Sequence, residues 1–413
     1  MNIGLLGAIG VEDIGDVVML QSTIELLRKN NNINKNNLKL TMFALNKDIA
    51  REQMDDNELE TDIVDAITID DLPNEIIENI NFCKLVKENI LEHIGKKEYL
   101  NKILDCDALF FIGGGYFNKY WGDKLIPSFI IPIAIGYKLN KPIYISGVNI
   151  GPFDSEHIDK FYGVFEKVNT IIIRDRNTSL DTLKKLGGTR GDIIFGGDDI
   201  LSRWYKDIDN IRCDEICAEG KKYAVVQLHH WVEMYSDNYI KFYKALAKFL
   251  ENLLDNKSIE RVFFLPFSLF KGVDYECGRR LGTFIENRKE YIVFEPTKDY
   301  IFMRQLISGA EFLIGSRYHP VVFGIGEQVP TIGIYVNDLY KQKISGAFQA
   351  VEIDHNSNMI YVNDLTFEKL VKWYEDTKAK NYMNSDKIKE IMDKHNLNRR
   401  LSIEDFIYNL DVK

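Results

Sequence analysis

The sequence has few cysteines and no long hydrophobic run. Its 413 residues include five cysteines, an odd number without paired Cys-x-x-Cys spacing, and this pattern indicates free thiols in a reducing compartment. No apolar run reaches the ~20 residues that a membrane-spanning helix needs. The short apolar N-terminus lacks the basic leader of a signal peptide. We therefore expect a cytoplasmic protein.

An excess of basic residues is also absent. The chain has 52 Lys and Arg against 62 Asp and Glu, which gives a formal net charge of -10 and argues against a nucleic-acid partner. The first glycine turn lacks the G-x-G-x-x-G dinucleotide fingerprint. No cluster of metal-ligating residues is visible in the sequence. The sequence thus predicts neither a cofactor nor a metal.

Short apolar runs of β-forming residues alternate with amphipathic helical stretches along most of the chain. Strands are predicted at 2–6, 39–45, 108–112, 142–147, 170–173 and 192–195, and a second series begins at residue 223. This alternation predicts an α/β fold with parallel strands joined by helical crossovers. The unbroken apolar character of several runs predicts strands that are buried on both faces.

The length exceeds that of one ordinary domain. We predict an N-terminal Rossmann-like domain over 1–206, a C-terminal Rossmann-like domain over 223–366 and a C-terminal helical segment over 367–413. The polar stretch 207–222 is the predicted linker. Two doubly wound domains with a cleft between them correspond to a GT-B-like architecture.

The segment 312–343 is the most informative part of the sequence. It predicts a buried strand at 312–314, a turn that includes Ser316, and a helix that begins near Arg317 and His319. Ligands of open α/β sheets bind at this level, outside the carboxyl ends of the strands. Arg317 and Ser316 therefore predict an anion site, and the imidazole of His319 could move a proton. Lys343, in a predicted loop after the next strand, would support the site, with Lys341 as a competitor.

Other predicted strand ends carry further candidates. Gly113, Gly114 and Gly115 follow one strand and would let backbone approach a ligand, with Tyr116 next in the chain. Arg174 follows another strand, where it could bind an anion or pair with Asp175 or Asp198 as part of the scaffold. Asp16 lies at the start of the first predicted helix, and His229 ends the strand that opens the second series. Each could bind the acceptor of a reaction or could only stabilise a turn.

These elements in this order resemble the polysaccharide pyruvyl transferases. The matching positions are Gly15-Asp16, 113–115, Arg174-Asp175 with Ser179, Arg317-Tyr318-His319, Gly326 with Pro330, and Lys343. The family's usual first turn is closer to Gly-Asn-x-Gly-Asp-Glu, whereas this chain has Glu-Asp-Ile-Gly-Asp-Val at 12–17. The resemblance spans roughly residues 2–348 and depends on the order of short motifs.

The resemblance implies transfer of the enolpyruvyl group of phosphoenolpyruvate to a saccharide of a cell-surface or cell-wall polysaccharide, giving a pyruvate ketal and phosphate. Arg317 and Arg174 would hold the two anionic ends of the donor, with Lys343 in support, and His319 would transfer the proton. The acceptor could be a lipid-linked saccharide met at the membrane surface, and homo-oligomerisation stays open. Two alternatives also stay open: a GT-B glycosyltransferase that uses a nucleotide-sugar, and a non-catalytic sugar- or anion-binding relative.

Overall fold

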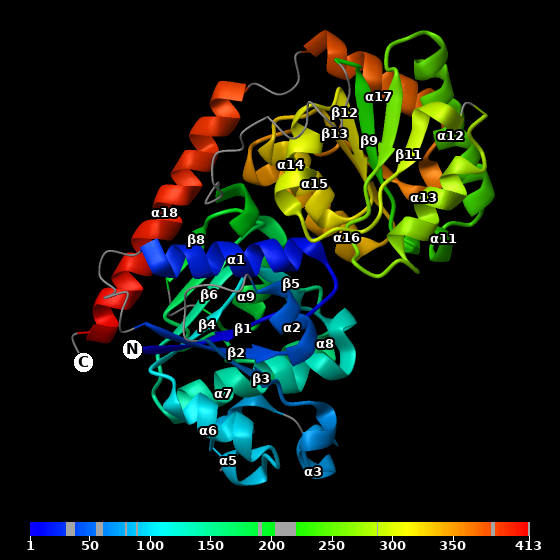
Figure 1. Ribbon diagram of the computed structural model, residues 1–413. Helices are drawn as coiled ribbons and strands as arrows, with labels where there is room; N and C mark the ends of the chain where they lie inside the picture. Colours follow the sequence, from blue (N-terminus) through cyan, green and yellow to red (C-terminus); the bar gives the residue numbers. More distant parts are fainter. Residues whose placement is uncertain are drawn as a thin grey trace. The chain divides into compact units, whose positions relative to one another are not determined.

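The computed structural model describes residues 1–29, 38–54, 61–78, 81–87, 90–188, 192–202, 220–286, 288–380 and 385–411. The chain forms two compact units (Figure 1). The first consists of Met1–Val11, Asp16–Trp204 and Lys394–Lys413, and the second of Glu12–Gly15 and Tyr205–Asp393. Most of the predicted linker lies outside the described residues, so the boundary at 206–223 stays a prediction.

The first unit is built on a parallel sheet with the strand order β3-β2-β1-β4-β6-β7-β8, and β5 pairs with β6. The strands are β1 (Asn2–Leu6), β2 (Lys39–Ala44), β3 (Thr61–Asp65), β4 (Ala108–Phe111), β5 (Gly114–Phe117), β6 (Ile143–Ile150), β7 (Thr170–Ile173) and β8 (Asp192–Phe195). Its helices include α1 (Ile14–Lys29), α2 (Lys47–Gln53), α6 (Lys97–Asp105), α7 (Ile131–Lys138), α8 (Ser155–Phe161) and α9 (Asn177–Lys185).

Both faces of this sheet are buried. Successive strand residues point to opposite faces, and Phe110 and Phe111 accordingly belong to two different hydrophobic clusters. The cluster around Phe110 also includes Ile403 and Phe406 of helix α18 (Ser385–Asp411), drawn in red in Figure 1. The end of the chain therefore completes the core of the first unit.

The second unit has a six-stranded parallel sheet with the order β11-β10-β9-β12-β13-β14. Its strands are β9 (Tyr223–Gln227), β10 (Arg261–Phe264), β11 (Tyr291–Val293), β12 (Phe312–Gly315), β13 (Thr331–Tyr335) and β14 (Met359–Tyr361). Its helices include α11 (Trp231–Met234), α12 (Tyr239–Asp255), α13 (Asp274–Gly282), α14 (Tyr300–Ser308), α15 (Tyr318–Gly326), α16 (Asp338–Ala350) and α17 (Phe367–Lys380). Two parallel sheets with helical crossovers confirm the predicted α/β class.

The structure corrects one local prediction. Lys343 was expected in a loop, but it lies in helix α16, which begins three residues after the last residue of β13. The side chain of Asn337 caps that helix by accepting a hydrogen bond from the N–H of Tyr340. Helix α1 begins at Ile14, so Asp16 lies in its first turn, at the start of the helix as predicted.

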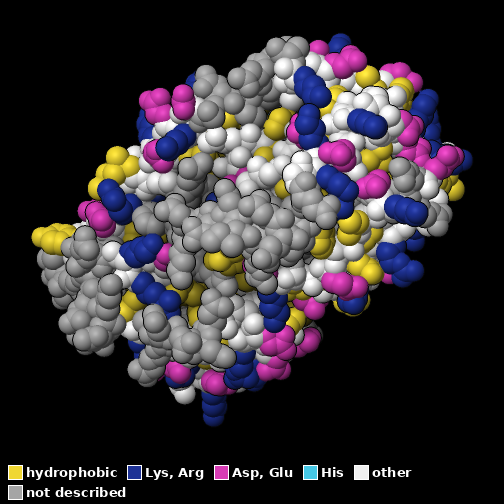
Figure 2. Space-filling model, turned by 45° about the horizontal axis from the view of Figure 1, so that its top comes forward, with side chains coloured by type: hydrophobic (Ala, Val, Ile, Leu, Met, Phe, Trp, Pro, Cys, Tyr) yellow, Lys and Arg dark blue, Asp and Glu magenta, His cyan; other side chains and the backbone are white. Residues whose placement is uncertain are grey.

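The surface mixes charges of both signs. In the view of Figure 2, Lys and Arg side chains lie among Asp and Glu side chains, with hydrophobic side chains scattered between them. Throughout the described residues, every helix is too short or too polar to cross a lipid bilayer.

Candidate functional site

The junction between β12 and α15 lies beside the end of β9, because these two strands are neighbours in the sheet. Gln227, the last residue of β9, accepts hydrogen bonds through Oε1 from the N–H groups of Ser316 (3.2 Å) and Arg317 (3.0 Å). In return, Ser316 Oγ accepts a hydrogen bond from the N–H of His229 at 2.6 Å. These bonds fix the turn that leads into α15. Arg317 is the N-cap of that helix and makes no side-chain cap.

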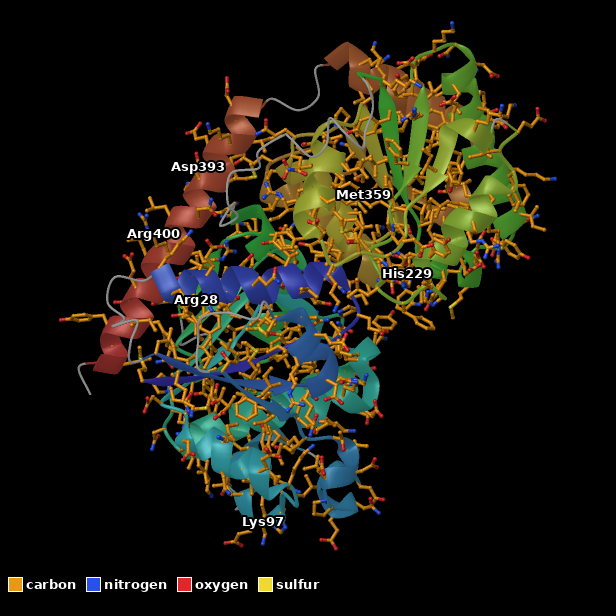
Figure 3. The ribbon with its side chains drawn as sticks, in the orientation of Figure 1. Arg28, Lys97, His229, Met359, Asp393 and Arg400 are labelled. Carbon is orange, nitrogen blue, oxygen red and sulfur yellow. The ribbon has the colours of Figure 1, made fainter. Side chains whose placement is uncertain are left out.

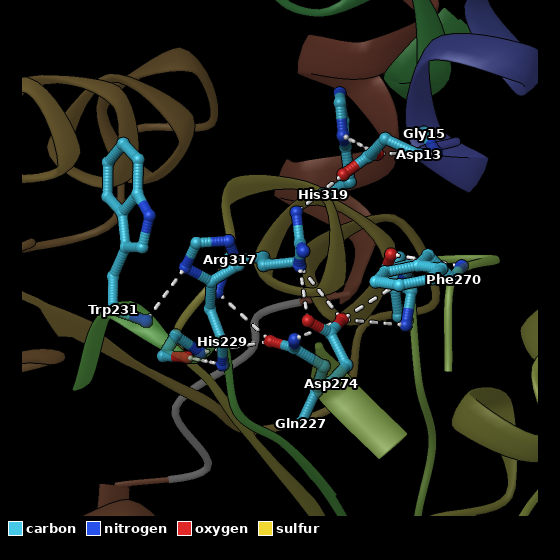
Figure 4. A network of polar contacts seen from close by, with 12 residues as sticks. Asp13, Gly15, Gln227, His229, Trp231, Phe270, Asp274, Arg317 and His319 are labelled. Atoms are coloured by element: carbon cyan, nitrogen blue, oxygen red, sulfur yellow. Dashed lines mark hydrogen bonds and ion pairs between the residues drawn. The ribbon is translucent and has the colours of Figure 1, made fainter. Parts of the chain in front are cut away.

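The guanidinium of Arg317 is held between two carboxylates, as Figure 4 shows. Its Nε donates to both oxygens of Asp274 at 2.9 and 2.8 Å, and its Nη1 donates to Asp13 at 2.8 Å. Asp274 is completely buried and also accepts from Gln227 and from two backbone N–H groups of the β10–α13 loop. Burial by itself would lower the pKa of Arg317, but Asp274 and Asp13 raise it. The group therefore stays cationic, and its charge is balanced within the protein.

Asp13 binds the imidazole of His319 as well. His319 Nδ1 lies 3.1 Å from Asp13 Oδ1, which also accepts a hydrogen bond from the N–H of Gly15 at 3.0 Å. Burial would raise the pKa of Asp13, but the hydrogen bond from His319 and the charge of Arg317 outweigh it and lower that pKa to about 2. Asp13 is thus a carboxylate at neutral pH. Because a carboxylate only accepts, Nδ1 must carry the hydrogen of this bond.

The segment that carries Asp13 belongs to the second unit. It is attached there by two backbone hydrogen bonds, from Ile14 N–H to the carbonyl of Phe267 (3.0 Å) and from Leu269 N–H to the carbonyl of Glu12 (2.9 Å). These two bonds hold the backbone on both sides of Asp13 in place, and from this position the Asp13 carboxylate contacts His319.

The other ring nitrogen of His319 has no hydrogen-bond partner in the part of the chain that the structure describes. His319 is 8% exposed, and its buried Nε2 makes no hydrogen bond to any residue that the structure describes. The ring packs directly on Gly15, since a Cβ at that position would lie 1.9 Å from Nδ1. Buried polar atoms normally have a partner, so the unsatisfied Nε2 of His319 needs an explanation.

A second imidazole and a lysine lie in the same neighbourhood. His229, which follows β9 (Figure 3), is buried and stacks on Tyr340 at 6.1 Å between ring centroids. The ammonium of Lys343 lies 5.7 Å from the centroid of the Tyr340 ring. Burial lowers the pKa of His229, and the charges of Arg317, His230 and Lys343 lower it further. The structure thus brings the predicted site residues of the second unit together.

Arg174 in the first unit makes the contacts of a scaffold residue. It is 1% exposed, its Nη1 donates to Asp198 at 2.7 Å, and its Nε donates to Asn149. This is the pairing that the sequence left open beside anion binding. Any contact of Arg174 with a donor molecule stays a prediction.

Internal packing accounts for two glycines of the predicted cradle. The N–H of Gly113 donates to Asp199 at 3.2 Å, and a Cβ at position 113 would lie 2.6 Å from the same carboxylate oxygen. Gly114 begins β5 with φ +157°, and its added Cβ would meet the ring of Tyr116 at 2.6 Å. Tyr116 itself is completely buried and stacks on Phe129 at 4.3 Å. That side chain therefore offers no exposed surface to a saccharide.

Three residues of the site were not anticipated, namely Asp13, Gln227 and Asp274. Asp13 lies two residues before the Gly15-Asp16 pair, which could have drawn attention to it. Gln227 and Asp274 looked like an ordinary strand end and helix start. No local pattern links them to Arg317.

Comparison with known proteins places this site in a family. The family model of the polysaccharide pyruvyl transferases matches residues 13–338, a range that begins at Asp13 and includes Arg317 and His319. The amylovoran biosynthesis protein AmsJ of Erwinia amylovora is 22% identical over 253 residues, which cover 58% of this chain. The match spans 59% of the length of AmsJ.

Solved structures share the fold over nearly the whole chain. The UDP-GlcNAc 2-epimerase of Methanocaldococcus jannaschii has a TM-score of 0.60 and 14% identity, over 98% of this chain and 100% of that one. A putative UDP-N-acetylglucosamine 2-epimerase of Listeria monocytogenes gives 0.58 and 10%, over 97% and 94% of the two chains. A glycosyltransferase of Rickettsia africae gives 0.54 and 11%, over 98% of both chains. These similarities confirm the predicted GT-B-like fold.

The family model covers most of the chain and includes both residues of the Asp13–His319 contact. The protein therefore belongs to the polysaccharide pyruvyl transferase family.

Proposed function

We propose that the protein transfers the enolpyruvyl group of phosphoenolpyruvate to two hydroxyls of a saccharide, forming a pyruvate ketal and releasing phosphate. The acceptor would belong to a cell-surface polysaccharide or to its lipid-linked precursor. The observation that carries this proposal is the hydrogen-bonded pair of Asp13 and His319, in which Asp13 also binds Arg317 and Nε2 of His319 has no hydrogen-bond partner among the described residues.

Ketal formation requires a proton donor at carbon. In the proposed reaction, protonated His319 gives its Nε2 proton to the methylene carbon of the donor, which becomes a methyl group. The two acceptor hydroxyls form bonds to the central carbon, and the bond from that carbon to the phosphate oxygen breaks. One hydroxyl proton restores His319, and the other leaves with the phosphate. Atoms and charges balance without a further reactant.

Asp13 would prepare His319 for this step. Its carboxylate fixes the ring through Nδ1–H and stabilises the positive charge on the imidazole. Asp13 and Asp274 carry two negative charges against the single positive charge of Arg317. Protonation of His319 during the reaction would add one positive charge beside Asp13. General acid catalysis of this kind contributes roughly 10²- to 10⁴-fold.

The contacts of Arg317 support a different role from the one first expected. Its Nε and Nη1 hydrogen bonds are used by Asp274 and Asp13, so it acts first as the support of Asp13. Positive potential for the donor would come in addition from the uncapped N-terminus of α15 and from Lys343. Donor binding would thus be shared among several groups.

Phosphate release tests the proposed reaction. Wild-type protein would be incubated with phosphoenolpyruvate and a panel of nitrophenyl glycosides, and released phosphate would be measured. His319→Gln, which cannot act as the acid, should lose activity by at least about 10²-fold, whereas exposed His93→Gln should keep it. Equal turnover by wild type and His319→Gln would refute the role of His319.

The shared fold supports one competing activity. The similar structures include UDP-GlcNAc 2-epimerases, so a nucleotide-sugar as the donor is a specific alternative. Thermal unfolding with phosphoenolpyruvate or with UDP-GlcNAc separates the two proposals, since only a ligand that binds the folded state raises the melting temperature. A rise with the nucleotide-sugar alone would favour the alternative. Binding of phosphoenolpyruvate without turnover on any acceptor would favour a non-catalytic relative.

A cytoplasmic location belongs to the same proposal. Cys83, Cys106 and Cys277 carry free thiols. Free thiols suit a reducing compartment.

A further inference from the structure

His229 lies at the centre of the site without a part in the proton transfer described above. It follows β9 directly, and its backbone N–H is bonded to Ser316, the neighbour of Arg317 in the chain. The side chain is 6% exposed, so little of it faces solvent. Figure 4 shows its ring between Trp231 and Arg317.

The hydrogen bonds of His229 define its tautomer. The N–H of Trp231 donates to Nδ1 at 3.2 Å. Since Nδ1 accepts, the hydrogen of the neutral ring must be on Nε2. Among the residues that the structure describes, none forms a hydrogen bond with this Nε2. His229 therefore presents one N–H donor in a fixed direction.

The surroundings hold this ring in place and keep it uncharged. Its centroid lies 4.3 Å from that of His230, 5.0 Å from Trp231 and 6.1 Å from Tyr340. Burial, and after it the positive charges of Arg317 and Lys343, hold its pKa far below the usual range. His229 thus stays neutral wherever the protein is folded and active, and it donates through Nε2 without taking up a proton.

We propose that the Nε2–H of His229 is an anion-binding donor of the active site and binds one oxygen of a small phosphorylated carboxylic acid. The ligand class rests on the proposed function, and the donor rests on the geometry of His229. A neutral N–H in a cationic neighbourhood suits an oxyanion, because Arg317 and Lys343 attract the charge while His229 sets the position of one oxygen. The two histidines would then divide the work: His319 transfers a proton, and His229 holds the substrate.

Two substitutions separate the donor from the rest of the side chain. His229→Asn keeps an acceptor near the position of Nδ1 for Trp231 but has no donor at the position of Nε2. His229→Gln can place an N–H near that position. Titration calorimetry with phosphoenolpyruvate should show binding about 10- to 100-fold weaker for His229→Asn. His229→Gln should recover most of the loss, and exposed His93→Asn should bind as wild type does.

The pH dependence and smaller anions provide further readouts. Because His229 does not titrate, His229→Asn should weaken binding by the same factor from pH 6 to pH 8. A factor that changes with pH in this range would contradict a neutral donor. Inorganic phosphate and pyruvate, titrated separately, identify the anionic end: the ligand whose binding weakens in His229→Asn is the one that His229 holds.

The outcomes distinguish this inference from the proposed function. Wild type that binds phosphoenolpyruvate together with an equally tight, folded His229→Asn would overturn the inference alone. Wild type that fails to bind phosphoenolpyruvate would overturn the proposed function, and with it the ligand assigned to His229. If His229→Asn and His229→Gln lose affinity for phosphoenolpyruvate equally and keep native circular dichroism spectra, binding depends on the packing of the ring and not on its N–H.

Discussion

At the scale of single residues, Gly15 controls the position of His319. A Cβ at position 15 would lie 1.9 Å from Nδ1 and 2.0 Å from Cγ of the ring, so the ring would have to move. Its bond to Asp13 would break. We predict that Gly15→Ala lowers phosphate release by about 10²-fold or more, comparable with the loss of a general acid.

Gly95 provides the matched control for Gly15. A Cβ there would have no atom nearer than 3.9 Å. Gly95→Ala should therefore leave the rate of phosphate release unchanged. If Gly15→Ala releases phosphate at the wild-type rate, the reaction does not depend on the observed position of the His319 ring.

Asp13 should make the stability of the protein depend on pH in acid. Its pKa falls from 3.8 to about 2 on folding, so its stabilising effect is complete above about pH 4 and is lost as the pH falls through about 2. A shift of this size corresponds to about 2 kcal/mol. Urea unfolding of wild type and Asp13→Asn at pH 2, 3, 4 and 5 measures how the free energy of unfolding of each protein depends on pH. The free energy of unfolding of Asp13→Asn should depend less on pH than that of wild type. Plots of this free energy against pH that run parallel for the two proteins would refute the effect.

The sequence revealed the polar residues at strand ends but not their partners. Arg317 and His319 stand out because they follow an unbroken apolar strand. Asp13 is 304 positions away from Arg317, and Asp274 is 43 positions away. Such pairs are set by sheet topology and loop course, which no local pattern contains.

At the scale of elements, continuous apolar runs made most strands predictable. Central strands such as β7 are buried on both faces and form continuous apolar runs. The edge strand β3 is half-buried and polar residues interrupt its sequence, so it was missed, and the half-buried strand β14, which has only three residues, was missed as well. Helix α16 was missed at its start because Asn337 and Asp338 look like loop residues, although Asn337 is the cap.

Asp274 joins three elements of the second unit. It is the first residue of α13, and it accepts hydrogen bonds from the end of β9 and from Arg317 at the start of α15. Removing one partner of a buried pair leaves an uncompensated charge, which costs roughly 3–5 kcal/mol. We predict a loss of this size in the free energy of unfolding for Asp274→Ala, measured in urea.

Asp274→Asn is the matched variant, because it keeps the shape of the side chain and loses its charge. It should be destabilised less than Asp274→Ala. A loss below about 1 kcal/mol in Asp274→Ala, the range of exposed ion pairs, would contradict the account.

At the scale of the whole molecule, the chain returns to the unit in which it began. Residues 394–413 were predicted as part of a separate helical segment, but the structure includes them in the first unit. Arg399 is completely buried there, pairs with Asp199 at 3.0 Å and donates to the carbonyls of Gly196 and Gly197. The many charges of this helix gave no sign of that contact, since buried and exposed arginines look alike in a sequence.

This arrangement predicts that α18 stabilises the first unit through Arg399. Arg399→Ala would remove the arginine that pairs with the buried carboxylate of Asp199 and should cost roughly 3–5 kcal/mol. The adjacent Arg400, labelled on α18 in Figure 3, has a side chain that is 54% exposed, and Arg400→Ala should cost less than about 1 kcal/mol. Thermal unfolding of both variants checks this, and equal melting temperatures would contradict it.

The measurement that tests the central claim most directly is proton transfer to phosphoenolpyruvate in heavy water. If His319 protonates the methylene carbon, each transferred group gains one deuterium, and mass spectrometry of the glycoside product should find a CH₂D group. His319→Gln and Asp13→Asn should form this product far more slowly than wild type. Product without deuterium, or product made at the wild-type rate by His319→Gln, would contradict the proposed mechanism.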